Sequence, residues 1–161
     1  MVYLASLFLI IKFHRMIAFI AALILAFVLM EGAAWGAHKY LMHGFMWKIH
    51  EDHHKPTGHV FQKNDLFFMI FAVPSWLCIM LGVIYGANFS IGFGAGIAVY
   101  GVVYFLVHDV LIHRRFKWFD KTQNRYFKAI RKAHKVHHKN QGKEDGECFG
   151  MLLVPRKYFK A

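Results

Sequence analysis

Histidine is the residue type in this chain whose number and spacing point most clearly to chemistry. Twelve of the 161 residues are histidines, and ten of them follow one order twice: a pair with four residues between its members, then a His-x-x-His-His triplet. The ten are His38, His43, His50, His53 and His54, then His108, His113, His134, His137 and His138. Neutral imidazole binds Zn, Cu, Fe and Ni, and one such ion takes about four to six ligands. Ten imidazoles therefore predict a site for two metal ions.

Helical geometry brings most of these side chains together. Residues at i, i+3 and i+4 share one face of an α-helix, so the three members of each triplet are expected to point together. A further helical face is predicted to run from His43 through Trp47 to the first triplet. The pairs fit less well, because five residues correspond to a rotation of about 140° on a straight α-helix. We therefore expect the helices to be irregular at both pairs, or the members of a pair to serve different ions.

The surroundings of the histidines suggest how the rings are oriented. A metal-bound imidazole usually donates its other ring N–H to an acceptor, and Glu51, Asp52 and Asp109 are the adjacent candidates. His14 and His59 lie outside the repeated order and are expected to be non-ligands. No catalytic acid or base beyond the metal ligands is predicted.

The composition indicates which elements position these residues. Hydrophobic residues make up 57% of the chain and charged residues 18%, whereas soluble domains have about 45–50% and 25%. Residues 66–107 contain no Lys, Arg, Asp, Glu or His, which is enough for two membrane helices of about 20 residues each. Turn residues at 86–90 separate them into spans at 66–85 and 91–107. Another span covers 16–37, and residues 1–11 form either a short extra helix or an interfacial segment. We therefore predict one all-α domain over residues 1–161, a membrane bundle of three or four helices with a histidine-rich di-metal cap.

Glycines in these spans favour close helix packing. Gly32 and Gly36 have the small-xxx-small spacing of membrane helix contacts, as do Gly92 and Gly96. The stretch from Gly92 onward lacks the G-x-G-x-x-G order, so helix packing is favoured there over a nucleotide-binding loop.

The distribution of positive charge predicts the orientation. Of the 20 Lys and Arg residues, 4 lie between residues 38 and 65 and 14 lie after residue 108. The positive-inside tendency places both segments in the cytoplasm, and a helical hairpin between them returns the chain to the same side. Lys12 and Arg15 would then lie on the far side, against the tendency. The net charge of +11 is thus explained by the flank of a membrane protein, without a nucleic-acid partner.

The motifs HKYLMH, HEDHH, HDVLIH and HKVHH, with KEDGECFGMLLVP at residues 143–155, resemble those of the bacterial β-carotene hydroxylases in the fatty acid hydroxylase superfamily. The resemblance covers nearly the whole chain. It implies a membrane-bound non-haem di-iron monooxygenase that uses O2 as co-substrate and holds two Fe ions. It also carries the metal-ligand role onto all ten histidines of the repeated order.

The same resemblance implies a substrate and partners. The enzymes hydroxylate C3 of β-ionone rings, so that β-carotene becomes β-cryptoxanthin and then zeaxanthin, and 4-keto carotenoids such as canthaxanthin would give astaxanthin. The carotenoid would come from the bilayer lipids of the bacterial inner membrane, and the site would lie on its cytoplasmic face. The chain has no flavin, haem or iron–sulfur motif, and its only cysteines are Cys78 and Cys148. Electrons would therefore come from an external donor of the ferredoxin type and its reductase, attracted by the basic face.

Three alternatives share parts of this pattern. A fatty acid or sterol hydroxylase or desaturase would use the same ligands, and so would a carotenoid 4-ketolase. A histidine-rich metal transporter is the non-enzymatic alternative. Transport predicts ionisable residues at mid-membrane, yet the hairpin has none and Glu31 is the only one in the 16–37 span.

Overall fold

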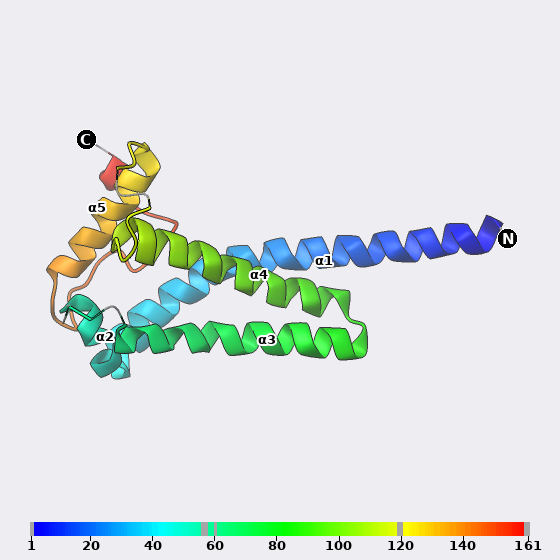
Figure 1. Ribbon diagram of the computed structural model, residues 1–161, viewed down its shortest axis with the longest axis horizontal. Coiled ribbons are helices and arrows are strands. Elements are labelled where there is room, and N and C mark those ends of the chain that lie inside the picture. Colours follow the sequence, from blue (N-terminus) through cyan, green and yellow to red (C-terminus); the bar gives the residue numbers. More distant parts are fainter. Residues whose placement is uncertain (1, 56–57, 60, 119–120, 160–161) are drawn as a thin grey trace. The chain divides into compact units, whose positions relative to one another are not determined.

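The regular structure of this protein is helical throughout the part of the chain that the computed structural model describes, residues 2–55, 58–59, 61–118 and 121–159. Figure 1 shows the order of the elements. They are α1 (Val2–Gly36), η1 (Ala37–Phe45), α2 (Trp47–His54), η2 (Lys63–Phe67), α3 (Phe68–Tyr85), α4 (Asn88–Phe105), η3 (Leu106–Ile112), α5 (Arg125–Lys139) and η4 (Arg156–Phe159). The predicted all-α class is confirmed.

Three helical stretches are long and apolar enough to cross a membrane. They are Tyr3–Phe45, Lys63–Tyr85 and Asn88–Ile112, which confirms the three predicted spans. The predicted separate segment at residues 1–11 is wrong, because α1 continues through it without a break. A helix of 35 residues is about 50 Å long at 1.5 Å per residue. It therefore exceeds the roughly 30 Å hydrocarbon core of a bilayer.

The chain forms two compact units. The first consists of the residues up to Met30 together with Met69–Gly101, and the second consists of Glu31–Phe68 and the residues from Val102 onward. All ten histidines of the repeated order belong to the second unit. The assignment of residues 1–161 to a single domain stays a prediction.

The first unit contains the predicted helical hairpin. Gly86 ends α3 with a φ of +66°, a left-handed conformation that glycine adopts without steric cost. The next helix begins at Asn88, three residues before the expected start. Across the hairpin the Ser75 hydroxyl donates to the Gly94 carbonyl at 2.7 Å. This bond supplies the partner that a polar side chain needs in a membrane.

Two glycines of α4 set how closely it approaches α1. A Cβ atom would lie 2.2 Å from the Phe19 carbonyl oxygen if added at Gly92, and 2.3 Å from that of Leu23 if added at Gly96. The backbones of α1 and α4 are therefore in direct contact, as the spacing predicts. The same prediction is wrong for Gly32 and Gly36, where an added Cβ meets no atom of another helix within 4 Å among the described residues.

Replacement of Gly92 by alanine is expected to destabilise this contact. The added methyl group collides with backbone, which cannot move aside as a side chain would, so the cost is about 1–3 kcal/mol. Thermal unfolding of the helical circular dichroism signal in detergent measures it. Gly101→Ala is the matched control on the same helix, because a Cβ there meets nothing within 4 Å. Equal midpoints for the two variants would contradict the close contact.

The second unit is built around α5. The helix begins after Asn124, whose side chain accepts hydrogen bonds from the backbone N–H groups of Tyr126 and Phe127, a standard N-terminal cap. Its buried face carries Ile130, which packs with residues of η3 and of the C-terminal segment, and the same face carries buried histidines. Apolar packing thus fixes the helix that presents the second triplet.

Both histidine pairs lie on π-helical segments. His38 and His43 are in η1, and His108 begins the turn in η3 that closes with a hydrogen bond from the His113 N–H to the His108 carbonyl at 2.9 Å. A π-helix bonds residue i to i+5, which brings residues five apart onto one face. The expected irregularity is confirmed at both pairs. The helix is not continuous from His43 to Trp47, because the backbone leaves the helical conformation at Gly44. The predicted shared face is nevertheless formed, since the centroid of the Trp47 ring lies 5.1 Å from that of His43 and 5.3 Å from that of His54.

Candidate metal centre

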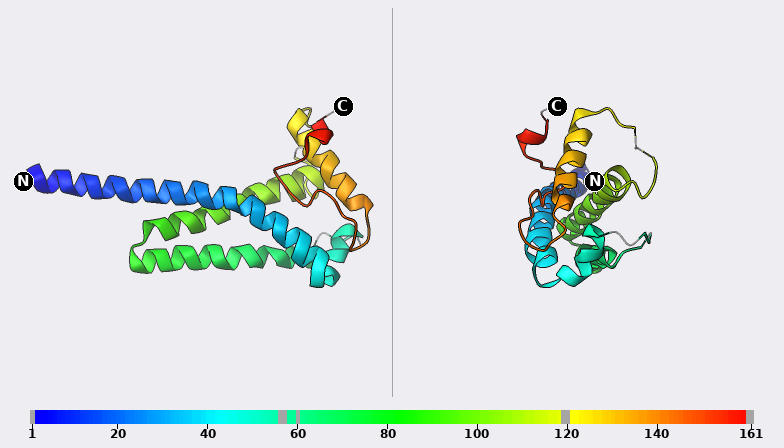
Figure 2. Two further views of the ribbon diagram at one scale, coloured as in Figure 1. Left: turned by 180° about the vertical axis from the view of Figure 1, so that it is seen from behind. Right: turned by 90° about the vertical axis from the view of Figure 1, so that its left-hand side faces the viewer.

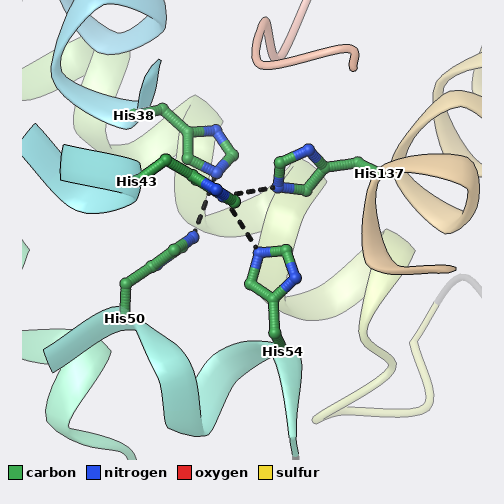
Figure 3. A group of neighbouring side chains, drawn as sticks. All are labelled: His38, His43, His50, His54 and His137. Carbon is green, nitrogen blue, oxygen red and sulfur yellow. Dashed lines mark hydrogen bonds between the residues drawn. The ribbon is translucent and has the colours of Figure 1, made fainter. Parts of the chain in front are cut away.

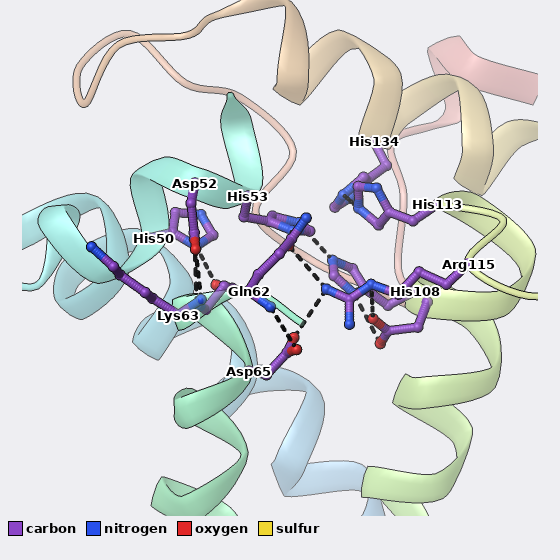
Figure 4. A network of polar contacts seen from close by, with 12 residues as sticks. His50, Asp52, His53, Gln62, Lys63, Asp65, His108, His113, Arg115 and His134 are labelled. Carbon is purple, nitrogen blue, oxygen red and sulfur yellow. Dashed lines mark hydrogen bonds and ion pairs between the residues drawn. The ribbon is translucent and has the colours of Figure 1, made fainter. Parts of the chain in front are cut away.

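Nine of the ten histidines gather into two neighbouring groups of side chains, and the tenth, His138, lies beside one of them. Cluster A consists of His38, His43, His50, His54 and His137, and cluster B consists of His53, His108, His113 and His134. Within each cluster one ring nitrogen from every residue lies within 4.8 Å of all the others. His138 lies beside cluster B, with its Nε2 atom 2.8 Å from that of His134. Figure 3 shows cluster A, and Figure 4 shows members of cluster B with their polar neighbours.

The division of the triplets between the clusters differs from the prediction. In the first triplet His50 and His54, four residues apart, join cluster A, while His53 joins cluster B. In the second triplet the partition is reversed, because His137 turns to cluster A while His134 lies in cluster B. The members of a triplet therefore do not point together. Each cluster instead combines residues from both halves of the repeated order.

Every ring of cluster A has an oxygen at its outer nitrogen. The Nδ1 atoms lie 2.6–3.0 Å from these oxygens. Four of the acceptors are main-chain carbonyls: Phe149 accepts from His38, Lys143 from His43, Asn140 from His54 and Glu147 from His137. The fifth is the side-chain oxygen of Asn64, which accepts from His50. A carbonyl oxygen only accepts, so each Nδ1 carries the ring hydrogen.

This arrangement leaves the inner nitrogens of cluster A without hydrogen. A neutral imidazole has one N–H, so the Nε2 atoms present lone pairs to one another. His38 and His50 approach at 3.2 Å, and His43 lies 3.2 Å from His54 and 3.3 Å from His137, all between Nε2 atoms. Lone pairs at that separation repel unless a cation lies between them. The donor set therefore fits a bound metal ion.

Burial keeps the triplet rings of cluster A in the neutral form that binds metals. Burial, together with the smaller effect of nearby His54, lowers the pKa of His50 to about 3. The pKa of His137 falls to about 3 for the same two reasons. Burial likewise lowers the pKa of His54 to about 4. The three rings are consequently neutral at pH 7 and need no deprotonation before they bind an ion.

Cluster B uses side-chain acceptors at its outer nitrogens. The Nδ1 atom of His53 donates to the Gln62 side-chain oxygen at 2.9 Å, and that of His108 lies 3.3 Å from a carboxylate oxygen of Asp109. The inner Nε2 atoms of these two rings are 3.0 Å apart. As in cluster A, two hydrogen-free nitrogens face each other.

Arg115 holds both of these acceptors in place (Figure 4). Its guanidinium donates to the Gln62 side-chain oxygen at 2.9 Å, to Asp65 at 2.9 Å and to Asp109 at 3.1 Å. Since Gln62 accepts from Arg115 and also from His53, its amide oxygen must face the ring. The charged network thus fixes the orientation of two cluster B rings.

The three acidic residues predicted to hold the rings have different roles. Asp109 contacts His108, as expected. The prediction that Asp52 accepts a ring N–H is wrong. Its carboxylate accepts from the backbone N–H groups of Lys63 and Asn64 at 2.6 and 3.4 Å, and it thereby orders the segment that supplies the partner of His50. The prediction for Glu51 is wrong, because its carboxylate pairs with Lys55 at the surface at 2.8 Å.

Sequence reasoning missed most of the oxygens that contact the rings. Gln62 and Asn64 are ordinary amides with no motif around them, and the other acceptors are main-chain carbonyls between residues 140 and 149. A carbonyl is present at every residue, so only the recognisable 143–155 motif signalled this segment. His14 and His59 are exposed and lie outside both clusters.

The fold and the site together define a class of protein: an all-helical chain with three membrane-spanning candidates and two histidine clusters that can hold metal ions. The chain belongs to the fatty acid hydroxylase family, whose model matches residues 23–155, a range that includes all ten clustered histidines.

Its relatives include three bacterial proteins named β-carotene hydroxylase. The protein of Pseudescherichia vulneris is 40% identical over 131 residues, covering 81% of this chain and 74% of the relative. That of Pantoea ananas is 42% identical over 132 residues, covering 78% and 71%. That of Paracoccus sp. strain PC1 is 33% identical over 129 residues, covering 80% and 79%. No solved structure matches the chain. The family resemblance seen in the motifs is thereby confirmed.

Proposed function

We propose that this protein is a β-carotene 3-hydroxylase, an O2-dependent non-haem di-iron monooxygenase. It would hydroxylate C3 of both β-ionone rings, converting β-carotene through β-cryptoxanthin to zeaxanthin, and canthaxanthin to astaxanthin. The observation that carries the proposal is the convergence of inward-facing Nε2 atoms in two clusters, in a chain 40% identical to a protein named β-carotene hydroxylase. All ten clustered histidines would be metal ligands, with His138 completing cluster B.

The chemistry requires a redox-active metal, iron or copper, and the resemblance to the di-iron hydroxylases favours iron. Hydroxylation of an unactivated C–H bond requires a redox change, which zinc does not undergo, and imidazole is a good ligand for iron. Two iron ions in the clusters would supply the redox chemistry that activates O2. The donor set is almost entirely imidazole, unlike that of soluble di-iron bundles, which use several glutamates.

The residues around the clusters keep the ligand rings fixed and dry. The Phe149 ring lies 5.4, 5.1 and 5.2 Å from the rings of His38, His43 and His137, measured between centroids. On the other side, the Tyr104 ring stacks on His108 at 5.0 Å. Aromatic walls of this kind limit ring rotation and exclude water, which strengthens every electrostatic interaction inside the site.

The substrate class agrees with the position of the ligands along the chain. Carotenes dissolve in bilayer hydrocarbon, and the histidine pairs lie at the ends of two candidate membrane spans, Tyr3–Phe45 and Asn88–Ile112. A β-ionone ring that moves laterally within the lipid would reach such a site without crossing water. The Lys and Arg residues that flank the clusters favour the cytoplasmic face of the bacterial inner membrane.

Pigment analysis after expression in a β-carotene-producing bacterium tests this proposal. The expected products are β-cryptoxanthin and zeaxanthin. Keto products at C4 would identify a ketolase, and unchanged carotene with altered fatty acids or sterols would identify a lipid hydroxylase or desaturase; either result would overturn the assignment. Purified membranes with added β-carotene, reduced ferredoxin and O2 repeat the test with a defined electron donor.

The exposed face of α5 is the proposed docking surface for a ferredoxin-type donor, itself reduced by its reductase. Lys128, Lys132, Lys135 and Lys139 are exposed on this helix, while His134 and His137 are buried on it. A helix with its side chains is about 10–12 Å across, so a donor on the exposed side would lie close to the ligands. Cations attract an acidic carrier and raise its rate of association.

Lys135→Glu is expected to raise the KM for reduced ferredoxin about tenfold at low salt. The iron content and kcat at saturating donor should stay unchanged, and the difference should shrink as salt screens the charges. Lys117→Glu is the control, since it makes the same charge change at an exposed position outside α5. A KM that rises equally in both variants, or does not rise at all, would contradict docking on α5.

A further inference from the structure

The segment that follows α5, residues 140–153, serves cluster A in particular. We call it the strap. Four of its main-chain carbonyls, those of Asn140, Lys143, Glu147 and Phe149, accept the outer N–H groups of four cluster A rings at 2.8–3.0 Å. In the left view of Figure 2 the strap runs beside the chain that follows α1. Among the described residues, no strap carbonyl bonds to a cluster B ring, and the acceptors there are Gln62 and Asp109.

One carboxylate fixes the end of the strap. The Oε1 atom of Glu31 accepts hydrogen bonds from three consecutive backbone N–H groups, at 3.0 Å from Met151, 2.8 Å from Leu152 and 2.9 Å from Leu153. Hydrogen bonds to a carboxylate are among the stronger ones in proteins. The Tyr126 hydroxyl donates to the Leu152 carbonyl at 2.7 Å, which holds the same turn from α5.

The position of Glu31 makes this contact unusual. It is the only ionisable residue between Arg15 and His38, and it lies within the Tyr3–Phe45 membrane-span candidate. An ionisable side chain in such a helix is costly and usually has a specific partner. Here the partner is a turn that begins two residues after Phe149, whose carbonyl orients His38.

We propose that Glu31 is a positioning residue for the metal ion of cluster A and not for that of cluster B. By holding the strap, it keeps the four carbonyls where they fix the ring hydrogens on Nδ1 and leave Nε2 free to bind. The proposal rests on the metal-ligand roles assigned above. Loss of a partner that orients a metal-bound histidine typically weakens metal binding about 10- to 100-fold. Glu31→Ala should therefore lower the affinity for the ion of cluster A by that factor and leave the affinity for the ion of cluster B unchanged.

Metal titration of the full-length protein in detergent tests this inference. Metal-free protein is titrated with Co2+ against a competing chelator, and the ions bound per chain and their affinities are measured. Glu31→Ala is expected to retain one ion with wild-type affinity and to bind the second about 10- to 100-fold more weakly. Glu31→Gln, which keeps an acceptor oxygen at the same distance from the helix, should restore most of the loss.

Two further variants assign the affected ion to a cluster. Gln62→Leu removes the oxygen that accepts the His53 N–H, so it should lower the affinity for the ion of cluster B. His137→Ala already removes a ring of cluster A. In that background Glu31→Ala should cause little further loss of metal affinity, whereas Gln62→Leu should still lower the affinity for the ion of cluster B. A Glu31→Ala protein that binds both ions normally, or loses both equally, would overturn the role of Glu31. Wild-type protein that binds fewer than two ions would count against the proposed function instead.

A milder variant covers the case in which Glu31→Ala does not fold. Tyr126→Phe removes only the hydrogen bond to the Leu152 carbonyl, so it should lower the affinity for the ion of cluster A by a smaller factor than Glu31→Ala does. Circular dichroism and gel filtration verify that each variant is helical and monodisperse. Backbone amide exchange at residues 151–153 should be faster in the metal-free Glu31→Ala and Tyr126→Phe variants. Unchanged exchange together with unchanged metal affinity in Tyr126→Phe would contradict the strap's role.

Discussion

Replacing His137 with alanine is expected to abolish hydroxylation and to remove the ion of cluster A. The side chain is completely buried, its Nε2 atom lies 3.3 Å from that of His43, and its outer nitrogen donates to the Glu147 carbonyl at 2.8 Å. The substitution removes a donor and leaves one strap carbonyl unpaired. Iron content of the purified protein and turnover of β-carotene measure the effect.

The control for this variant is His59→Ala. His59 is exposed and outside both clusters, so the variant should keep wild-type iron content and turnover. Membrane insertion should be intact in both proteins, because neither residue contributes to the apolar spans. Normal iron and turnover in His137→Ala would contradict its ligand role, and an inactive His59→Ala would revise the ligand set.

Replacing His53 with alanine is expected to cause a comparable loss through the other cluster. Only 1% of this side chain is exposed, and its Nε2 atom lies 3.0 Å from that of His108. His53 is also the ring that Gln62 and Arg115 orient together. In the proposed di-iron mechanism both ions act on one O2 molecule, so loss of either should stop turnover. Iron content and zeaxanthin formation are the measurements.

Glu51→Ala is the matched control for His53, because both residues lie on α2. Glu51 faces solvent and pairs with Lys55, and exposed pairs of this kind contribute little to stability. The variant should hydroxylate as the wild type does. An active His53→Ala protein with full iron content would show that cluster B does not need this ring.

The partition of the triplets gives these two predictions a common basis. In each triplet the residues four apart join one cluster and the remaining one joins the other. Each cluster therefore depends on α2 and on α5 at once. Displacement of either helix would therefore disturb both clusters, and the apolar packing of Ile130 and its neighbours holds α5 in place.

The clusters differ in what orients their rings. Cluster B depends on a charged side-chain network around Arg115, whereas cluster A depends largely on carbonyls of the strap. Side-chain acceptors can be removed individually by substitution, but main-chain carbonyls can be moved only through what anchors them. Glu31 is for that reason the residue through which cluster A can be tested separately.

The sequence by itself determined which histidines are available to the clusters, the candidate membrane spans and the irregular helices at the histidine pairs. These features depend on residue type and on the fixed period of the α-helix, and both can be read along a single stretch of chain. His38 and His43 could not share a face of a regular helix, so a distortion followed from their spacing alone. The hairpin at residues 66–107 followed from its length and its lack of charge.

Only the tertiary structure decided which cluster each histidine joins and which oxygens orient the rings. His43 meets Lys143, and Glu31 meets Met151, across about a hundred residues of chain. Contacts at such separations depend on how the helices pack, and a main-chain carbonyl or N–H leaves no mark in the sequence because every residue but proline has both. The histidines that gather in the clusters could therefore be singled out from the sequence, while the groups that hold their rings required the folded chain.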